Sequence, residues 1–502
     1  MTSRRLRAFK RWMTSNGIQY SDALQFTDSR DEGIAVRALC DLREGDVVAN
    51  IPKLACLTVK TSAACSIIEE AALGGYLGLS VAVMYEKSLG EGSKWAGYLQ
   101  LLPDRECLPL LWSLEDVDQL LCGTELHKTV KEDKTLMFED WKENIVPLMV
   151  SAPSMFSLEF FGVEKYFCAR SLISSRSFEI DDFHGFGMVP LADLFNHKTN
   201  AEDVHFTLVS SDIESDNSSV HLNDVHPYDE SKSWNSPLDE AGSDSVLTEA
   251  NSAYDINSDS SSLGGDPTTL EMIMVKNVKA GDEVFNTYGS LGNAALLHRY
   301  GFTEADNLYD IVNIDLELVT DWCSSLFSRR HSRARVSLWR KLEYCGCGND
   351  NTEYFEISYD GEPQTELLIL LYIMLLPEDA FNYFALTTSV SGNFCGVMLC
   401  EKGKSTWIED SEISRDVLLT KDVRKALVSL ADMRESLYGS SCFGKDLGTV
   451  CCVQDRKLYH SLMLCESERM ILKKLRTYAA VGSQLSSTER RSSLRKEAHM
   501  NK

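Results

Sequence analysis

Apolar and polar positions at the start of the chain predict one helix followed by short strands. Within residues 6–13, large apolar residues recur at helical spacing in a basic segment, which predicts a first helix. Residues 33–38 and 46–51 are short apolar runs, each placed after a Gly-containing acidic turn. The second run ends at Pro52, a residue that ends regular pairing, so we expect a strand, a turn and a strand here.

Between about residues 60 and 172 the apolar period becomes helical, and it returns to short strands afterwards. Three- and four-residue apolar steps predict helices at 76–87, 112–121, 128–150 and 155–173. Short strands are expected at 187–191, 204–209, 270–278 and 283–287. Further helices are expected at 293–300, 316–343, 364–376, 416–438 and 457–478, before a polar, basic tail that begins near 483.

Residues 210–268 interrupt this pattern. Ser, Asp and Asn dominate the segment, and Lys232 is its one Lys or Arg. Such a composition cannot bury enough apolar area to offset the entropy of an ordered chain. We therefore predict a disordered acidic insertion that joins two strands of one sheet. Both a passive loop and a regulatory or partner-binding segment are compatible with it.

Length and composition are those of a core-forming chain of several domains. The 502 residues favour two to four domains, and 44% of them are hydrophobic and 25% charged. No apolar run reaches the roughly 18 residues of a membrane span, so we expect no membrane partner. The N-terminus lacks the apolar stretch of a secretory signal. An organelle transit signal, such as one for the chloroplast, is the less favoured alternative.

Net charge and cysteine content indicate which classes of partner and which cellular compartment the chain favours. The formal net charge of −25 repels nucleic acid and attracts cationic partners, although acidity also serves solubility alone. Fifteen scattered cysteines without regular spacing favour reduced thiols, hence the cytoplasm or the nucleus. The tight pairs Cys345/Cys347 and Cys451/Cys452 lack the two further ligands of a zinc site, so we expect no metal.

Three short segments, far apart in the chain, carry the candidate chemistry. They are Asp-Glu-Gly-Ile-Ala at 31–35, Asp-Leu-Phe-Asn-His at 193–197 and Glu-Val-Phe-Asn-Thr-Tyr-Gly at 283–289, the last followed by Tyr-Gly-Phe at 300–302. Each is weak alone, since Asn-His is commonly a hydrogen-bonded turn pair and Tyr-Gly a core aromatic before a turn. Their order is specific, as is the spacing of the second and third once the acidic insertion is discounted.

On these motifs the chain resembles the SET-domain methyltransferases, in the branch similar to the Rubisco large-subunit and ribosomal-protein lysine methyltransferases. The resemblance covers nearly the whole chain. It implies an α+β fold, with short strands in a knot-like crossing, a helical insertion and an all-α C-terminal domain. The implied segments are SET parts at 1–59 and 166–305, the helical insertion at 60–165, a substrate-binding-like helical domain at 306–480 and a polar tail at 481–502.

The resemblance implies S-adenosyl-L-methionine (SAM) as the methyl donor. Glu32, Gly33 and Ile34 would contact SAM, with glycine allowing a close approach of the backbone. Relatives often have a second glycine at Ala35, and alanine there would tighten that pocket.

The second motif and a preceding arginine complete the implied cofactor site. Asn196 and His197 resemble the pair that holds SAM by its amino-acid end and its adenine. Arg176 resembles the arginine near the SAM carboxylate and the substrate channel, where a guanidinium fork suits a carboxylate. A structural arginine at a helix end is the alternative for Arg176.

The third motif implies the catalytic group. Tyr288 resembles the catalytic tyrosine, which also contacts SAM, and Tyr300 resembles a second tyrosine of the lysine channel. Asp193 resembles a residue that contacts the target lysine. Phe206 stands where relatives often have a tyrosine lining the lysine pocket, and loss of that hydroxyl would change how many methyl groups are added.

The implied reaction needs a neutral amine, but no dedicated base. Removing the proton of a lysine at neutral pH costs about 4 to 5 kcal/mol, because its ordinary pKa is near 10.4. A dry channel beside a sulfonium cation disfavours the ammonium and lowers that pKa. The tyrosine hydroxyl and nearby carbonyls would orient the methyl group by weak C–H···O contacts.

We therefore expect an enzyme that methylates a lysine of a non-histone protein with SAM, as a monomer. Two alternatives stay open: methylation of a histidine in a protein, and a catalytically silent SET scaffold that binds a protein partner. The retained Asn196, His197 and Tyr288 argue against the scaffold, which has no chemical need for them.

Deletion of residues 212–266 should leave the fold and the in vitro activity largely intact, because so polar a segment contributes little to a hydrophobic core. Melting temperature and methyl-transfer rate of the deleted and full-length chains check this expectation. A collapse of the melting temperature on deletion would show that the segment is structured.

Overall fold

The chain folds into two compact units, each made of two separate stretches of sequence. The computed structural model describes residues 3–29, 33–207, 268–341, 354–391, 397–401, 404–408, 415–439, 450 and 455–500, and only the backbone at 207, 387–391, 397–401, 404–408 and 481–500. Unit 1 consists of Met1–Asp104 and Leu148–Gly289, and unit 2 of Arg105–Pro147 and Ser290–Lys502. The domain boundaries expected from the sequence follow chain order instead, and they stay a prediction.

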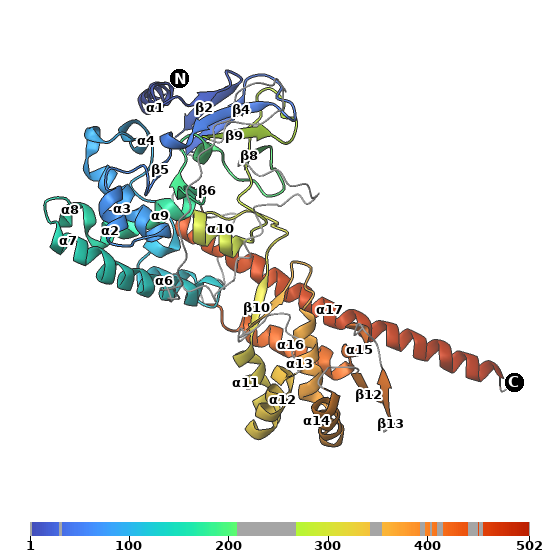
Figure 1. Ribbon diagram of the computed structural model, residues 1–502. Coiled ribbons are helices and arrows are strands. Elements are labelled where there is room, and N and C mark those ends of the chain that lie inside the picture. Colours follow the sequence, from blue (N-terminus) through green and yellow to red (C-terminus); the bar gives the residue numbers. More distant parts are fainter. Residues whose placement is uncertain are drawn as a thin grey trace, which may run out of the picture. The chain divides into compact units, whose positions relative to one another are not determined.

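Unit 1 holds short antiparallel strands in three groups (Figure 1). One sheet has the order β1-β4-β9-β8, a second the order β5-β7-β6, and β2 pairs with β3 alone. The strands are β1 (Gln19–Tyr20), β2 (Leu24–Ser29), β3 (Gly33–Ala38), β4 (Val47–Pro52), β5 (Leu57–Thr58), β6 (Ser177–Asp181), β7 (Gly185–Met188), β8 (Val204–Thr207) and β9 (Thr269–Met274).

The two strands that flank the acidic insertion are neighbours. β8 pairs antiparallel with β9, with Val204 opposite Met274 and Thr207 opposite Glu271. Leu270, Met272 and Met274 of β9 are buried while the residues between them are not, the alternation of a half-buried strand. The prediction that the insertion joins two strands of one sheet is confirmed, while residues 208–267 lie outside the described residues.

The helices of unit 1 come from its N-terminal segment and from the helical segment that follows β5. They are α1 (Arg4–Ser15), α2 (Cys65–Glu70), α3 (Gly75–Ser88), α4 (Ala96–Leu99), α8 (Leu158–Phe161) and α9 (Val163–Arg176). The α1 helix begins at Ser3, whose hydroxyl caps the Leu6 amide, and it buries Leu6, Phe9 and Met13. The α3 helix is buried almost all round and packs against α9, which carries Arg176 at its last position.

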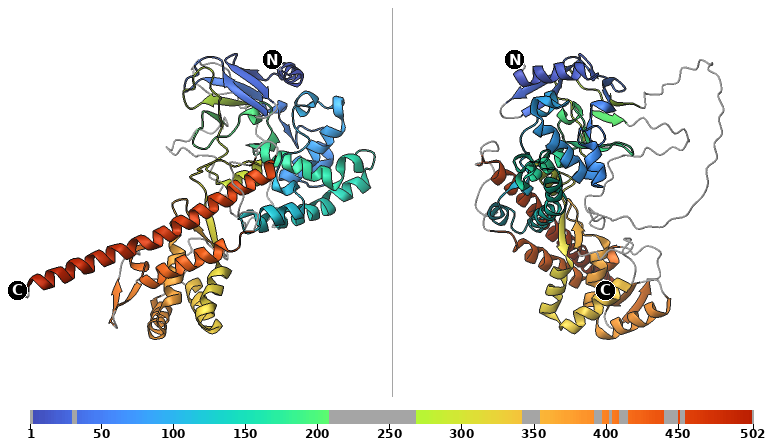
Figure 2. Two further views of the ribbon diagram at one scale, coloured as in Figure 1. Left: turned by 180° about the vertical axis from the view of Figure 1, so that it is seen from behind. Right: turned by 60° about the vertical axis from the view of Figure 1, so that its left-hand side comes forward.

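Unit 2 is mainly helical, with one large apolar core and a smaller one. Its elements are α5 (Leu114–Leu120), α6 (Leu126–Asp140), α10 (Asn293–Tyr300), β10 (Val312–Asp315), α11 (Leu316–Leu326), α12 (Arg329–Lys341), β11 (Tyr354–Ile357), α13 (Thr365–Leu375), α14 (Glu378–Ser391), β12 (Val397–Glu401), β13 (Lys404–Ile408), α15 (Arg415–Leu418), α16 (Lys421–Glu435) and α17 (Arg456–Met500). The apolar α13 lies at the centre of the large core, and α17 packs along α16 (Figure 2). The helices α5, α6, α10 and α17 contribute to the smaller core. α7 (Val146–Ser151) contains the boundary between the units.

Three helices predicted as continuous are broken in the structure. The segment 155–173 is α8 and α9, separated at Gly162, where the chain turns extended and a Cβ would lie 2.8 Å from the Leu158 carbonyl oxygen. The segment 316–343 is α11 and α12, broken at an extended Phe327. The segment 416–438 is α15 and α16, and Thr420 caps the second helix. The spacing of apolar residues alone does not reveal such breaks.

Two further expectations differ from the structure. Residues 283–287 do not form a strand; they make isolated bridges, with Arg37 opposite Glu283 and His197 beside Asn286. The predicted helix 457–478 ends before the polar tail that begins near 483, whereas α17 continues to Met500. Among the described residues, no single helix could cross a bilayer by length and apolarity, whereas α13 with Glu378–Leu386 passes as a pair bent by 119°.

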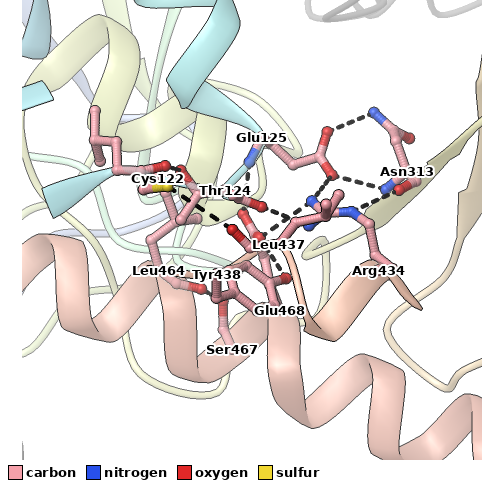
Figure 3. A network of polar contacts seen from close by, with 12 residues as sticks. Cys122, Thr124, Glu125, Asn313, Arg434, Leu437, Tyr438, Leu464, Ser467 and Glu468 are labelled. Carbon is pink, nitrogen blue, oxygen red and sulfur yellow. Dashed lines mark hydrogen bonds and ion pairs between the residues drawn. The ribbon is translucent and has the colours of Figure 1, made fainter. Parts of the chain in front are cut away.

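A buried ionic network fastens the two stretches of unit 2 to each other (Figure 3). Arg434 of α16 donates to the Glu125 carboxylate at 3.0 Å and lies 3.6 Å from Glu468 of α17. Tyr438 donates to Glu468 at 2.8 Å, and the Glu125 carboxylate also accepts from Asn313. All three ionisable side chains are at most 8% exposed, so removal of the Glu125 carboxylate would leave the Arg434 guanidinium buried without a charged partner at neutral pH.

The network makes the stability of unit 2 depend on pH. Burial first, and then the neighbouring Glu125 carboxylate, raise the pKa of Glu468 from 4.5 to about 8. The folded chain therefore keeps a proton that the unfolded chain has lost. The resulting stabilisation is complete below pH 4.5 and is lost as the pH rises through about 8.

Glu468→Gln should flatten this dependence, because the amide stays neutral at every pH. Calorimetry at pH 5 and pH 9 measures the fall in melting temperature between the two pH values. We expect this fall to be smaller in the variant than in the wild type by at least about 2–4 °C, which is the change that 1 kcal/mol produces in a domain of 150–250 residues. The control is Glu435→Gln, whose carboxyl has a lowered pKa beside Arg469 and Arg476, and it should follow the wild type. Equal falls in all three proteins would contradict the assignment.

Candidate active site

The second and third motifs cross each other in unit 1. His197 and Asn286 form a parallel bridge, in which the Asn286 amide donates to the Asn196 carbonyl at 2.9 Å. The Tyr288 hydroxyl donates to the Phe195 carbonyl at 3.1 Å. Residues 195–197 therefore lie against residues 286–288, although the acidic insertion separates them in sequence.

His197 and Tyr288 are locked face to face at this crossing. The Tyr288 amide donates to Nδ1 of His197 at 3.0 Å, and the two rings stack with their centroids 5.0 Å apart. Since Nδ1 accepts a hydrogen bond, the imidazole is neutral and carries its proton on Nε2, which lies 3.3 Å from the Thr199 hydroxyl. The side chain of His197 thus holds the crossing together.

Asn196 connects the crossing to the first motif. Its amide nitrogen donates to the Ile34 carbonyl at 3.2 Å and to the Glu283 carboxylate at 2.8 Å. A backbone bond of 2.8 Å from the Val284 amide to the Val36 carbonyl fixes the same neighbourhood. The three motifs found in the sequence therefore meet in one place.

Gly33 begins the strand that reaches this meeting point. Its φ is +78°, a conformation that residues with a side chain rarely adopt, while a Cβ added to it would meet no atom of the described residues within 4 Å. The backbone conformation therefore favours glycine here, and crowding by the described residues does not. Glu32 lies outside the described residues. The predicted SAM contacts of Glu32, Gly33 and Ile34 stay predictions.

Arg176 and Asp193 form a partly buried ion pair beside the crossing. Nη1 of Arg176 donates to the Asp193 carbonyl at 3.2 Å and lies 3.5 Å from its Oδ2. The Arg176 side chain is 24% exposed, whereas the Asp193 carboxylate is fully buried and accepts from the Tyr98 hydroxyl at 2.8 Å. Burial raises the pKa of Asp193. The Arg176 guanidinium and the Tyr98 hydroxyl act against this rise, because both favour the charged carboxylate. The Asp193 carboxylate is buried in the protein. Its predicted contact with the target lysine stays a prediction.

A strained residue sets the position of Asp193. Leu191 is fully buried and has φ 82° and ψ −47°, close to a three-residue turn that is rare for a side-chain-bearing residue. A short helical turn, Ala192–Leu194, follows directly and carries Asp193. Strain of about 1–3 kcal/mol persists only where its surroundings enforce it, and such residues cluster at functional sites.

The remaining predicted residues lie in different places. Phe206 of β8 is half-buried and stacks on Phe178 of β6, with ring centroids 5.4 Å apart. Tyr300 belongs to unit 2, where it ends α10 directly before Gly301 at φ 76°. The substrate-channel roles of Phe206 and Tyr300 stay predictions.

Sequence reasoning missed three residues that build the site. Glu283 was noted only as the start of a motif, yet it binds Asn196. Tyr98 lies in a helical segment whose apolar pattern indicates that its ring is buried but says nothing about its hydroxyl. Nothing in the sequence around Leu191 indicates its unusual backbone conformation. Among the described residues, no cluster of three His, Cys, Asp or Glu side chains could hold a metal.

Curated relatives match most of the chain at low identity, and no family model matches it. The chain is 24% identical over 355 residues to ribosomal lysine N-methyltransferase 3 of Saccharomyces cerevisiae, covering 62% of the chain. It is 24% identical over 401 residues to N-lysine methyltransferase setd6 of Salmo salar, covering 76% of each protein. The chain spans 63% of the length of the yeast relative.

Solved structures share the fold over nearly the whole chain. A structure of Rubisco LSMT bound to sinefungin and monomethyllysine matches with a TM-score of 0.60 and 19% identity, covering 96% of this chain and 93% of that one. The SET domain of LSMT bound to lysine and AdoHcy matches with a TM-score of 0.57 and 18% identity. The predicted α+β SET-domain fold is confirmed.

Asn196→Asp should destabilise unit 1 by about 3 kcal/mol, because it removes two donated hydrogen bonds and sets a carboxylate against Glu283. Asn200→Asp is the matched control, since Asn200 is exposed at φ 64°, where Asp is tolerated. Thermal and denaturant unfolding should show a loss for the first variant and a change within about 0.5 kcal/mol for the second. Equal effects would contradict the bridging role of Asn196.

Proposed function

We propose that this chain, which has the SET-domain fold and matches lysine methyltransferases along most of its length, is itself a protein-lysine N-methyltransferase that uses SAM. The observation that carries the proposal is the meeting of Ile34, Asn196 and Tyr288 at one chain crossing. Those residues come from three separate motifs, and each is placed by hydrogen bonds to another of the three segments.

The residues at the crossing suit the groups that SAM presents. Arg176 offers a guanidinium, held on one side by Asp193, to the carboxylate of the amino-acid end. Backbone groups at Gly33, Ile34, Asn196 and His197 offer donors and acceptors for its amino group and adenine. When bound, SAM supplies a methyl group on a positively charged sulfur, which an amine can displace.

Tyr288 orients the reaction and does not act as its base. Its hydroxyl donates its proton to the Phe195 carbonyl at 3.1 Å, so the phenol oxygen acts as an acceptor towards other groups. Together with the Phe195 carbonyl it can accept weak C–H···O contacts from a polarised methyl group. Alignment of this kind supplies several kcal/mol of a barrier, provided that the amine and the methyl group are in line.

The proposed substrate is a lysine in a non-histone protein. The formal net charge of −25 favours a cationic target and disfavours nucleic acid. We propose that the enzyme works as a monomer in a reducing compartment, the cytoplasm or the nucleus. Six cysteines whose side chains the structure describes are free thiols, in keeping with such a compartment: Cys40, Cys56, Cys65, Cys107, Cys122 and Cys323.

Radiolabel transfer tests the activity directly. The chain is incubated with methyl-labelled SAM and a cell lysate, and the labelled proteins are hydrolysed for amino-acid analysis. We expect label in methylated lysine. Label in methylated histidine would favour the histidine methyltransferase, and SAM binding without transfer to any protein would favour the silent scaffold.

Tyr288→Phe should lower the rate of methyl transfer by orders of magnitude and leave SAM affinity nearly unchanged, because the hydroxyl serves the transfer step. Single-turnover kinetics and calorimetric SAM binding measure the two quantities. Tyr85→Phe removes the same atom from a tyrosine of α3 whose ring packs near Phe156, and it should match the wild type. Unchanged turnover in Tyr288→Phe would contradict its role.

A further inference from the structure

Tyr98 reaches the candidate site from an element that no motif marks. It lies on α4, where its ring packs against both Phe9 and Trp12 of α1, with ring centroids 6.1 Å away in both cases. Its hydroxyl crosses to the second motif and donates to Oδ2 of Asp193 at 2.8 Å. The ring is therefore held by packing, and the hydroxyl has one specific acceptor.

The Asp193 carboxylate depends on few donors. Oδ2 receives the Tyr98 hydroxyl and lies 3.5 Å from Nη1 of Arg176. Oδ1 is fully buried and has no hydrogen-bond partner within the described part of the chain. A buried carboxylate with so few donors would draw the nearest cation closer if one donor were removed.

The distance between Asp193 and Arg176 is longer than that of a tight ion pair. Charge-assisted N–H···O bonds are about 2.7–2.9 Å long, whereas Nη1 and Oδ2 are 3.5 Å apart here. Tyr98 holds the same oxygen that faces the guanidinium, and so keeps the carboxylate from closing on it. Arg176 is instead anchored through the Asp193 carbonyl, and its side chain stays partly exposed.

We propose that Tyr98 is a positioning residue for cofactor recognition: through Asp193 it keeps Arg176 oriented towards the amino-acid carboxylate of SAM. This inference rests on the proposed function and adds to it a residue outside the three motifs. Tyr98 touches neither cofactor nor substrate in this account; it acts through the ion pair.

The proposal predicts a selective loss of affinity. S-adenosylhomocysteine carries the amino-acid carboxylate, and 5′-methylthioadenosine lacks it while retaining the nucleoside. Tyr98→Phe should weaken S-adenosylhomocysteine by about 10-fold, equivalent to about 1.4 kcal/mol, and leave 5′-methylthioadenosine within about 2-fold. A merely structural role would weaken both ligands equally.

Calorimetric titration of the full chain with the two ligands measures the ratio of its affinities for S-adenosylhomocysteine and 5′-methylthioadenosine. Tyr438→Phe is the matched control. Tyr438 is likewise buried and donates to a buried carboxylate, Glu468, at 2.8 Å, but it belongs to unit 2. Its variant should keep the wild-type ratio of affinities. An unchanged ratio in Tyr98→Phe, or the same change in both variants, would overturn the proposal.

Asp193→Asn serves if Tyr98→Phe does not fold, because the amide keeps the shape and removes the negative charge that lies 3.5 Å from Nη1 of Arg176. It should also lower affinity for S-adenosylhomocysteine selectively, and an unchanged ratio there would equally overturn the proposal. Failure of the proposed function is distinguishable on the wild-type chain alone: it would either bind neither ligand or, as the silent scaffold, bind S-adenosylhomocysteine and transfer no label.

Discussion

The contact of residues 195–197 with residues 286–288 is the constraint on which the candidate site depends. Two backbone carbonyls, of Phe195 and Asn196, accept from the Tyr288 hydroxyl and the Asn286 amide. The neutral His197 ring accepts from the Tyr288 amide and stacks on the Tyr288 ring. Each bond contributes roughly 1 kcal/mol, and together they fix the position of the Tyr288 hydroxyl at the crossing.

The rest of unit 1 supports this crossing from two sides. Asn196 ties it to the strand that begins at Gly33, and the strained Leu191 presents the turn that carries Asp193. The pairing of β8 with β9 brings the chain back into the same sheet after the acidic insertion. Unit 2 has its own polar centre, around Arg434, which fastens residues 105–147 to the C-terminal helices.

The meeting of the motifs could be predicted from their order along the chain and from the resemblance to SET-domain enzymes, although each motif is weak alone. Asn-His and Tyr-Gly carry donors, acceptors and a turn residue, and these features survive in the folded contacts of Asn196 and Tyr288. The apolar period predicted most helices but not their breaks at Gly162 and Thr420, which depend on local backbone geometry. Tyr98 could not be predicted, because burial of its ring hides the one atom that matters.

If three distant segments form one cofactor site in unit 1, as we propose, a bound cofactor must protect all three together. Hydrogen–deuterium exchange with and without saturating S-adenosylhomocysteine measures that protection. We expect added protection together in peptides that cover 33–38, 194–198 and 283–288, and none in α13 or α16. Protection confined to unit 2, or to one of the three segments alone, would contradict it.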